Sequence, residues 1–181
     1  AHAIQKRDIE HLKYTGEVAF FECSQYDIKS LVLQIVQSAL EKGYHLSDIQ
    51  LLACKYSGVA GIDRLNAALQ ECFNPHDPLL KEWKVGHRIF REGDRMLQLK
   101  NQIDDGVYNG DIGVIESINM QLMQFTVRFD GDKVSVLQYS DAEQIALAYA
   151  VTIHKSQGSE YPAVVIPILT GPRQLLHRNL L

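Results

Sequence analysis

The sequence predicts an α/β fold in which a parallel β-sheet with covering helices is interrupted by a small inserted β-barrel. Residues 17–54 read as strand, helix and strand joined by short links, a unit that builds parallel sheets. Residues 85–138 hold several short strands separated by turn signals, which is typical of a small barrel. Two short apolar runs follow, Ile145–Val151 and Ala163–Ile168, and each fits a buried strand of a parallel sheet.

Composition limits the classes of protein to which the chain can belong. Of its 181 residues, 46% are hydrophobic and 22% are charged, as in a soluble globular protein with a real core. The net charge is −4, so any nucleic-acid contact must come from a local patch, from hydroxyls or from backbone amides. The three cysteines form no Cys-x-x-Cys pair, which argues against a disulfide framework or zinc site and favours a cytoplasmic location. We expect the chain to be part of a longer protein.

The first α/β part begins with a predicted strand over Glu17–Cys23, which is rich in β-branched and aromatic residues. Asp27 is a plausible N-cap for a helix over Ile28–Lys42, where apolar residues recur at helical spacing. Gly43 supplies the stop, and an apolar strand follows over Ile49–Cys54. The cysteine that ends each of these strands is expected to be a small core residue.

A polar loop, Lys55–Gly61, follows that strand directly and opens a second helix, predicted to end at Cys72. Loops after parallel strands lie at the edge of the sheet where α/β proteins bind ligands. Tyr56 is therefore either an aromatic ring that covers the sheet edge or a ring that stacks on a nucleotide base. Beyond Asn74, the residues from Pro75 to Lys84 read as a linker.

The barrel is predicted from short strands and the turn residues between them. Asp130-Gly131 is a good hairpin signal. The predicted strands are Arg95–Leu99, Asp111–Asn119, Gln124–Phe129 and Lys133–Leu137. The predicted barrel core is Met96, Leu97, Val107, Ile112, Val114, Ile115, Ile118, Phe125, Val127, Phe129, Val134 and Val136.

The polar segment between the two apolar runs near the C-terminus holds the densest chemistry in the chain. Hydroxyl, imidazole and ammonium groups that can donate to phosphate oxygens come from Thr152, His154, Lys155 and Ser156. Gly158 would let backbone approach a ligand closely, and Glu160 could accept hydrogen bonds from a ribose hydroxyl. On spacing alone, a polar connection between two core strands explains the segment equally well.

Thr-x-His-Lys-Ser-Gln-Gly-Ser-Glu, from Thr152 to Glu160, followed by an apolar strand, resembles motif V of superfamily-1 helicases. The likeness is to the bacterial RecD-like DNA helicases, the family of the exodeoxyribonuclease V alpha subunit. Gly93-Asp94-Arg95-Met96 and Tyr108-Asn109-Gly110-Asp111-Ile112-Gly113 resemble patterns of the inserted SH3-like barrel of that family. Tyr56-Ser57-Gly58 resembles motif IV but has Ser57 where the family usually carries arginine. His177–Leu181 resembles the lead-in to motif VI.

The resemblance implies a RecA-like helicase domain 2A over residues 1–84 and 141–181, with the SH3-like barrel 2B inserted over residues 85–140. It implies an ATP-dependent DNA helicase that moves 5′ to 3′ along single-stranded DNA in repair or recombination. By the resemblance, the nucleotide-binding residues are Tyr56, Gln157, Gly158 and Glu160. The implied DNA-binding residues are Thr152, His154, Lys155, Ser156, Asn109, Tyr108 and Lys100. ATP and Mg²⁺ would be shared with a first motor domain of the same polypeptide, and subunits of a nuclease complex are further candidate partners.

Two elements of an ATPase are missing from the sequence. The 181 residues hold no Gly-x-x-x-x-Gly-Lys-Ser/Thr phosphate-binding loop, and no Asp-Glu pair closes an early strand to hold magnesium. We therefore expect the chain alone to be inactive. Two alternatives stay open, namely another superfamily-1 motor, such as a conjugative relaxase-helicase or an RNA helicase, and a non-enzymatic module that binds single-stranded nucleic acid.

Overall fold

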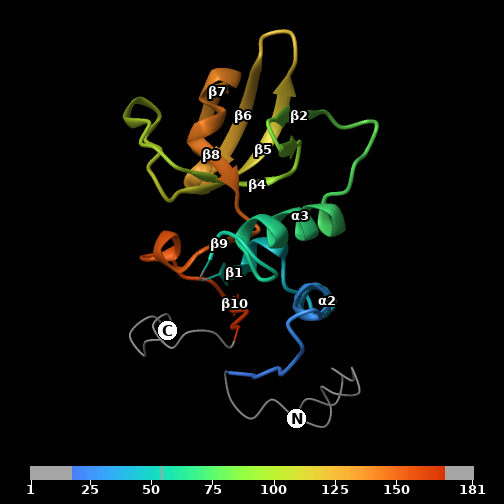
Figure 1. The fold of residues 1–181 in the computed structure, drawn as a ribbon. Helices are drawn as coiled ribbons and strands as arrows, with labels where there is room; N and C mark the ends of the chain where they lie inside the picture. The colour runs from blue at the N-terminus through green and yellow to red at the C-terminus, as the bar shows by residue number, and fades with distance from the viewer. Residues whose placement is uncertain (1–17, 54, 170–181) are drawn as a thin grey trace.

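The computed structural model describes residues 18–53 and 55–169 and shows an α/β part below a β-barrel (Figure 1). The α/β part consists of α2 (Ile28–Glu41), η2 (Leu46–Asp48), β1 (Ile49–Ala53), α3 (Ile62–Phe73), β9 (Ala150–Thr152), η6 (Ile153–Ser156) and β10 (Ala163–Val165). Its sheet is parallel with the order β10-β1-β9, so β1 is the central strand. The predicted α/β fold with an inserted barrel is confirmed.

The apolar faces of the two helices explain why this part folds. Ile28, Val32 and Val36 are four residues apart on α2, so they share one face, and all three are buried. Leu65 and Leu69 on α3 are also four residues apart and are each 1% exposed. These side chains pack with Ile49 and Leu51 of β1 and other residues in one core cluster. Gly43, at φ 94°, follows the C-terminus of α2 as predicted.

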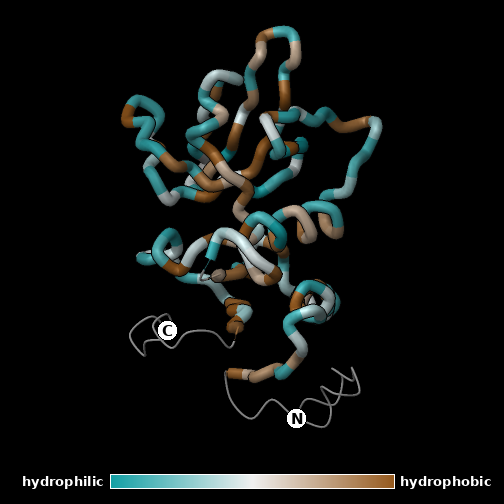
Figure 2. The backbone as a smooth tube through the Cα atoms, in the orientation of Figure 1, coloured by the Kyte–Doolittle hydropathy of each residue, from teal (hydrophilic) through white to brown (hydrophobic). Residues whose placement is uncertain are grey.

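The barrel part consists of β2 (Glu82–Val85), β3 (Arg88–Arg91), β4 (Arg95–Gln98), η3 (Ile103–Asp105), β5 (Ile112–Asn119), β6 (Gln124–Phe129), η4 (Asp130–Asp132), β7 (Val134–Gln138), η5 (Tyr139–Gln144) and β8 (Ile145–Leu147). Five of these strands form one antiparallel sheet with the order β7-β6-β5-β4-β8, and β2 pairs with β3. Hydrophobic and hydrophilic segments alternate along the chain in both parts of the molecule (Figure 2). The barrel has its own core cluster, and a small third cluster packs Leu97 of β4 with Ala148 and with Val151 of β9 between the two parts.

The predicted strand over Glu17–Cys23 is wrong for the residues that the structure describes. Residues 18–23 form no strand, and Val18 and Phe20 are 66% and 85% exposed. Both sides of β1 are already paired with β9 and β10, so this segment finds no place beside the central strand. Cys23 is exposed rather than in the core, and Cys54 lies outside the described residues.

The apolar run Ile145–Val151 is two strands in different sheets, and not one strand as predicted. Its first half, β8, pairs with β4 of the barrel, whereas its second half, β9, pairs with β1. Because β8 lies beyond residue 140, the barrel sheet extends past the predicted domain boundary; the boundaries themselves stay a prediction. The run Ala163–Ile168 forms a strand only over β10, which is half-buried at the sheet edge.

The barrel core differs from prediction in two ways. Val114, Val134 and Val136 are 42% to 51% exposed, because alternate residues of a strand point to opposite faces of the sheet. Trp83, placed in a linker by the sequence, is 8% exposed on β2 and stacks on Tyr139 with ring centroids 3.8 Å apart. Among the described helices, none has the length and apolar content needed to cross a membrane.

Candidate nucleic-acid and nucleotide interface

The motif V segment begins where β9 ends, beside the carboxyl end of β1. Thr152 pairs with Ala53 across the sheet and caps η6, because its Oγ1 accepts the backbone N–H of Lys155 at 3.1 Å. The Ser156 hydroxyl donates to the carbonyl of Ile153 at 2.9 Å. These two local bonds fix the turn, which leaves His154 exposed at its surface.

The barrel loop predicted to contact DNA lies against this turn. The ammonium of Lys155 donates to Oδ1 of Asn109 at 2.7 Å, although the two residues are 46 positions apart. Asn109 is itself held by Asn101, whose Oδ1 accepts the Asn109 backbone N–H at 2.8 Å. A Cβ on Gly110 would lie 4.0 Å from the carbonyl oxygen of Lys155, so the two backbones also run close together. The barrel loop and motif V thus form one continuous polar surface.

Further along the same loop, the Tyr108 ring is 49% exposed. The Lys133 ammonium lies 5.9 Å from the centroid of this ring and donates to the carbonyl of Gly106 at 3.0 Å. Lys100 is exposed on the connection that follows β4. Asn101 is among the loop residues that the sequence offers for a DNA contact, whereas Lys133 is not, since only the folded chain brings Lys133 to Tyr108. The Asp-Gly turn before Lys133 was the one available signal.

Backbone carbonyls of the motif IV loop cap the N-terminus of α3. The carbonyl of Lys55 accepts the N–H of Ile62 at 3.1 Å, and that of Tyr56 accepts the N–H of Asp63 at 3.4 Å. A Cβ on Gly61 would lie 2.5 Å from the Tyr56 carbonyl oxygen, so only glycine fits this close approach. These N–H groups are therefore not free to cradle a phosphate, while the Tyr56 ring is 61% exposed.

The predicted nucleotide-binding residues do not all gather at one point. The Tyr56 loop and η6 follow the carboxyl ends of β1 and β9, which are neighbouring strands, so both start at the same edge of the sheet. Gln157, Gly158 and Glu160 are exposed on the crossover to β10, which begins at the opposite edge, where Ala163 pairs with Ile49. Gly158 adopts φ 88°, a left-handed conformation that favours glycine.

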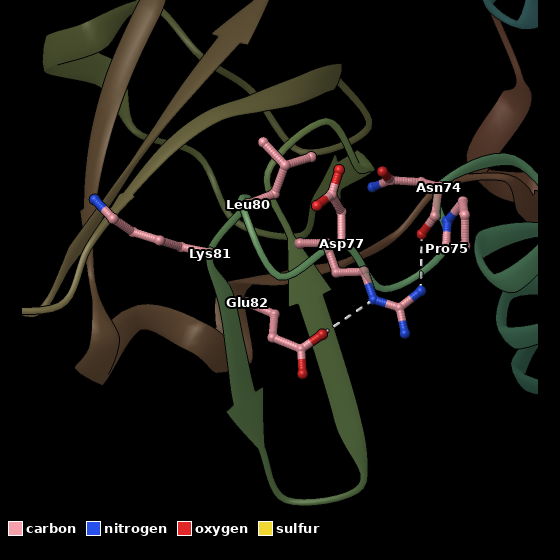
Figure 3. Close-up of a pocket in the computed structure, with 7 residues that line it drawn as sticks. Asn74, Pro75, Asp77, Leu80, Lys81 and Glu82 are labelled. Carbon is pink, nitrogen blue, oxygen red and sulfur yellow. Dashed lines mark hydrogen bonds and ion pairs between the residues drawn. The ribbon is translucent and has the colours of Figure 1, made fainter.

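A shallow recess lies where the chain passes from α3 into the barrel (Figure 3). It does not offer a ligand site, because its arginine, Arg91, is hydrogen-bonded to neighbouring protein groups. The Arg91 guanidinium donates to Glu71 at 3.2 Å, to Glu82 at 3.2 Å and to the carbonyl of Asn74 at 2.7 Å. A hydrogen bond from His76, helped by Arg91, holds the pKa of Glu82 below its usual value despite some desolvation. Within residues 18–53 and 55–169, no group of three His, Cys, Asp or Glu side chains is arranged to hold a metal ion.

Comparison with known proteins identifies both parts of the chain. The SH3 domain of ATP-dependent RecD-like DNA helicases matches residues 65–129, and the UvrD-like helicase C-terminal domain matches residues 147–181. The ATP-dependent RecD2 DNA helicase of Deinococcus radiodurans is 32% identical over 132 residues, which is 73% of this chain and 18% of that protein. The chain belongs to the RecD-like superfamily-1 helicases. The resemblance inferred from motif V is confirmed, and the barrel is SH3-like.

Two further similarities complete the comparison of this RecD-like chain. The RecBCD enzyme subunit RecD of Mycolicibacterium smegmatis is 30% identical over 137 residues, which is 75% of this chain and 23% of that protein. A structure of Pif1 helicases at forked double-stranded DNA aligns with 81% of this chain and 42% of its own, at 18% identity and a TM-score of 0.49. The chain spans about a fifth of the length of the two relatives.

Proposed function

We propose that this chain forms the second motor domain, with its inserted barrel, of an ATP-dependent helicase that moves 5′ to 3′ along single-stranded DNA. The matched family and the RecD2 relative are named as ATP-dependent DNA helicases. The observation that carries the proposal is the 2.7 Å contact between Lys155 and Asn109. This contact joins motif V to the barrel loop. Two segments far apart in the sequence therefore form one surface that a single ligand can bind.

On this surface, each side chain has chemistry that suits a single strand. Lys155, His154 and Lys100 offer donors to phosphates, and the hydroxyls of Thr152 and Ser156 lie beside them at the turn. The half-exposed ring of Tyr108 can stack on an unpaired base, an interaction that tolerates any sequence; we also assign Asn109 to this strand contact.

The nucleotide would be held mostly by the first motor domain. In this proposal, Tyr56, Gln157, Gly158 and Glu160 contact ATP, and Mg²⁺ arrives with its phosphates. Because residues 152–160 are one short segment, DNA at its start and nucleotide at its end bias the same conformational equilibrium. This shared equilibrium is the means by which hydrolysis would drive movement along the strand.

The test is unwinding by the full-length protein with ATP and Mg²⁺, comparing a duplex that has a 5′ single-stranded tail with one that has a 3′ tail. Unwinding of the 5′-tailed duplex alone is expected. Unwinding from the 3′ tail alone would assign the opposite polarity and another branch of superfamily 1. Unwinding of neither would favour a binding module in which the barrel acts without motor activity.

Removing the Lys155 charge should weaken DNA binding in a salt-dependent manner. In the full-length protein, Lys155→Ala is expected to lower single-stranded DNA affinity about threefold to tenfold. The slope of log affinity against log salt should fall by about 0.7, because one phosphate contact is lost. Fluorescence anisotropy across a salt series measures both quantities. Lys29→Ala, on the exposed face of α2, is the matched control. An unchanged slope for Lys155→Ala would remove this lysine from the DNA surface.

The biological setting belongs to the same proposal. We infer a cytoplasmic protein of DNA repair or recombination. The three cysteines are odd in number and form no Cys-x-x-Cys pair, which fits a reducing compartment. One relative is named as a subunit of the RecBCD enzyme and another as a RecD2 helicase in its own right. Purification of the endogenous full-length protein would show whether nuclease subunits accompany it.

A further inference from the structure

The barrel and the motif V strand are joined by a connection of two residues. β8 ends at Leu147 in the barrel sheet and β9 begins at Ala150 in the parallel sheet, with Ala148 and Tyr149 alone between them. Both connecting residues are buried, at 0% and 2% exposed. Figure 1 shows this segment descending directly from the barrel into the α/β part. Two residues leave little slack for the barrel to move without pulling on β9.

Buried amide side chains of the α/β part hold this connection. Asn66 of α3 donates to the carbonyl of Leu147 at 3.2 Å and to that of Ala150 at 2.9 Å, and its Oδ1 accepts the N–H of Ala150 at 2.8 Å. Gln50 of β1 donates to the carbonyls of Ala148 and Tyr149, each at 3.4 Å. Asn66 and Gln50 are 5% and 0% exposed. Buried hydrogen bonds therefore hold the end of β8, the connection itself and the start of β9.

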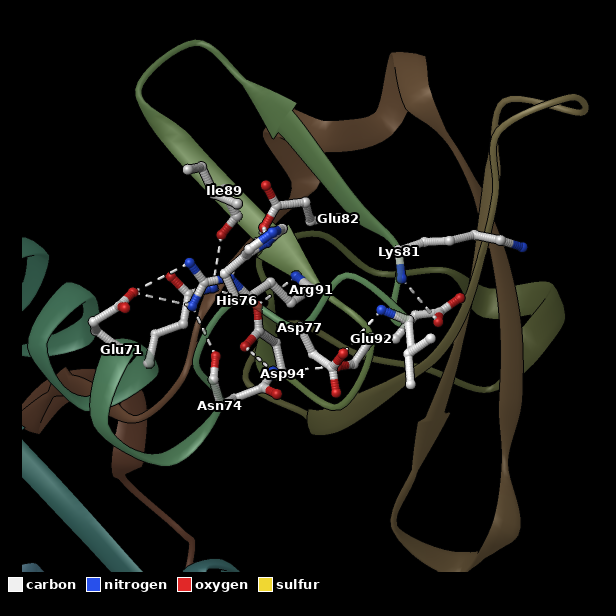
Figure 4. A network of polar contacts seen from close by, with 12 residues as sticks. Glu71, Asn74, His76, Asp77, Lys81, Glu82, Ile89, Arg91, Glu92 and Asp94 are labelled. Carbon is white, nitrogen blue, oxygen red and sulfur yellow. Dashed lines mark hydrogen bonds and ion pairs between the residues drawn. The ribbon is translucent and has the colours of Figure 1, made fainter.

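On the barrel side, Asp94 also holds the connection by hydrogen bonding. Its carboxylate, 0% exposed, accepts hydrogen bonds from the Tyr149 hydroxyl at 2.9 Å, from the α3 amides of Gln70 at 2.6 Å and Asn74 at 2.7 Å, and from the Arg91 backbone N–H at 2.7 Å. Figure 4 shows Asp94 and Asn74 in this polar network. Burial raises the pKa of Asp94, against the opposing effect of these donors.

Arg95 makes a second set of hydrogen bonds between the barrel and the α/β part. Its guanidinium donates to the carbonyls of Leu46 and Ile49 at 2.9 Å each, and to Oε1 of Gln50 at 3.1 Å. Its backbone carbonyl accepts the N–H of Ala148 at 2.9 Å. Arg95 is 7% exposed, and burial lowers the pKa of its guanidinium. With their buried partners, Asp94 and Arg95 thus form a joint between the barrel and the α/β part.

We propose that Asp94 and Asn66 are positioning residues that lock the barrel to the motif V strand, so that the two move as one rigid body. The barrel loop at Asn109 then keeps its place beside Lys155 while the nucleotide cleft opens and closes. Breaking the joint would leave buried donors and acceptors without partners, so rotation of the barrel is unfavourable. The effect of this lock rests on the proposed function, because in a helicase it would keep movement along DNA coupled to ATP hydrolysis.

The first test measures the lock without relying on activity. Spin labels at Lys29→Cys on α2 and Gln121→Cys at the β5–β6 turn, in a full-length protein freed of other reactive cysteines, report the barrel-to-motor distance. A narrow distance distribution is expected for the parent. Asp94→Asn should broaden it, because the new side-chain amide would turn an N–H toward donors, and Asn66→Ala should broaden it by releasing β9. Ile118→Ala, which weakens the barrel core without removing a side-chain hydrogen bond of the joint, should leave the distribution narrow.

The second test measures coupling, as base pairs unwound per ATP hydrolysed. Asp94→Asn and Asn66→Ala should lower this ratio about threefold to tenfold, while DNA-stimulated hydrolysis stays within about twofold of the parent. A purely structural defect would lower both activities together, as expected for Ile118→Ala. Narrow distributions in both joint variants would overturn the lock, and an unchanged ratio would overturn its role in coupling. If the parent unwinds neither tailed duplex, the proposed function fails, and the distances alone decide the lock.

Discussion

The purified 181-residue chain should hydrolyse no ATP above background. A motor of this kind needs a phosphate-binding loop with its lysine, and the sequence holds none. The one helix N-terminus beside the motif IV loop cannot substitute, because the carbonyls of Lys55 and Tyr56 already occupy the N–H groups of Ile62 and Asp63. Loss of the phosphate cradle and its charge removes essentially all transition-state stabilisation, so the expected effect is complete.

A coupled assay for phosphate release, with Mg²⁺ and single-stranded DNA present, checks this expectation. The control is the full-length protein under the same conditions, which should turn over ATP and do so faster with DNA. Glu160→Ala in the full-length protein should raise the KM for ATP, since this carboxylate is assigned to the nucleotide. DNA-stimulated turnover by the purified chain alone would contradict the assignment of this chain to a second motor domain.

Trp83→Ala should be the most destabilising single substitution tested in the barrel. Trp83 stacks on Tyr139 at 3.8 Å and packs on Phe125 and Phe90 with centroids 5.0 and 6.1 Å away. Truncating a buried aromatic residue costs about 3–5 kcal/mol of unfolding free energy. A barrel this small has little stability in reserve, so we expect the substitution to unfold it.

Denaturant unfolding followed by far-UV circular dichroism measures the loss, because Trp83 is the only tryptophan and its removal abolishes the fluorescence probe. Leu79→Ala is the matched control from the same segment. Leu79 is 90% exposed, so its truncation should change stability by no more than about 0.5 kcal/mol. Equal effects of the two substitutions would mean that Trp83 lies in a linker and not in the barrel core.

Sequence reasoning succeeded where the signal is local. Ile28, Val32 and Val36 repeat at the period of a helix, and the structure buries all three on α2. The predicted barrel face is wrong for β7, where Val134 and Val136 are exposed and Ser135 and Leu137 point inward. A strand pattern of alternate apolar residues fixes which residues share a face, yet only the pairing partners decide which face is buried.

The two helices, the inserted barrel and the family could be predicted from the amino-acid sequence. These depend on local periodicity, turn residues and short motifs, which a linear chain displays directly. Three features are visible only in the folded chain: Ile145–Val151 is divided between two sheets, Asn109 contacts Lys155, and Asp94 joins the barrel to α3 and Tyr149. These contacts link residues far apart in the chain, and they form because buried polar groups must find partners wherever packing brings them.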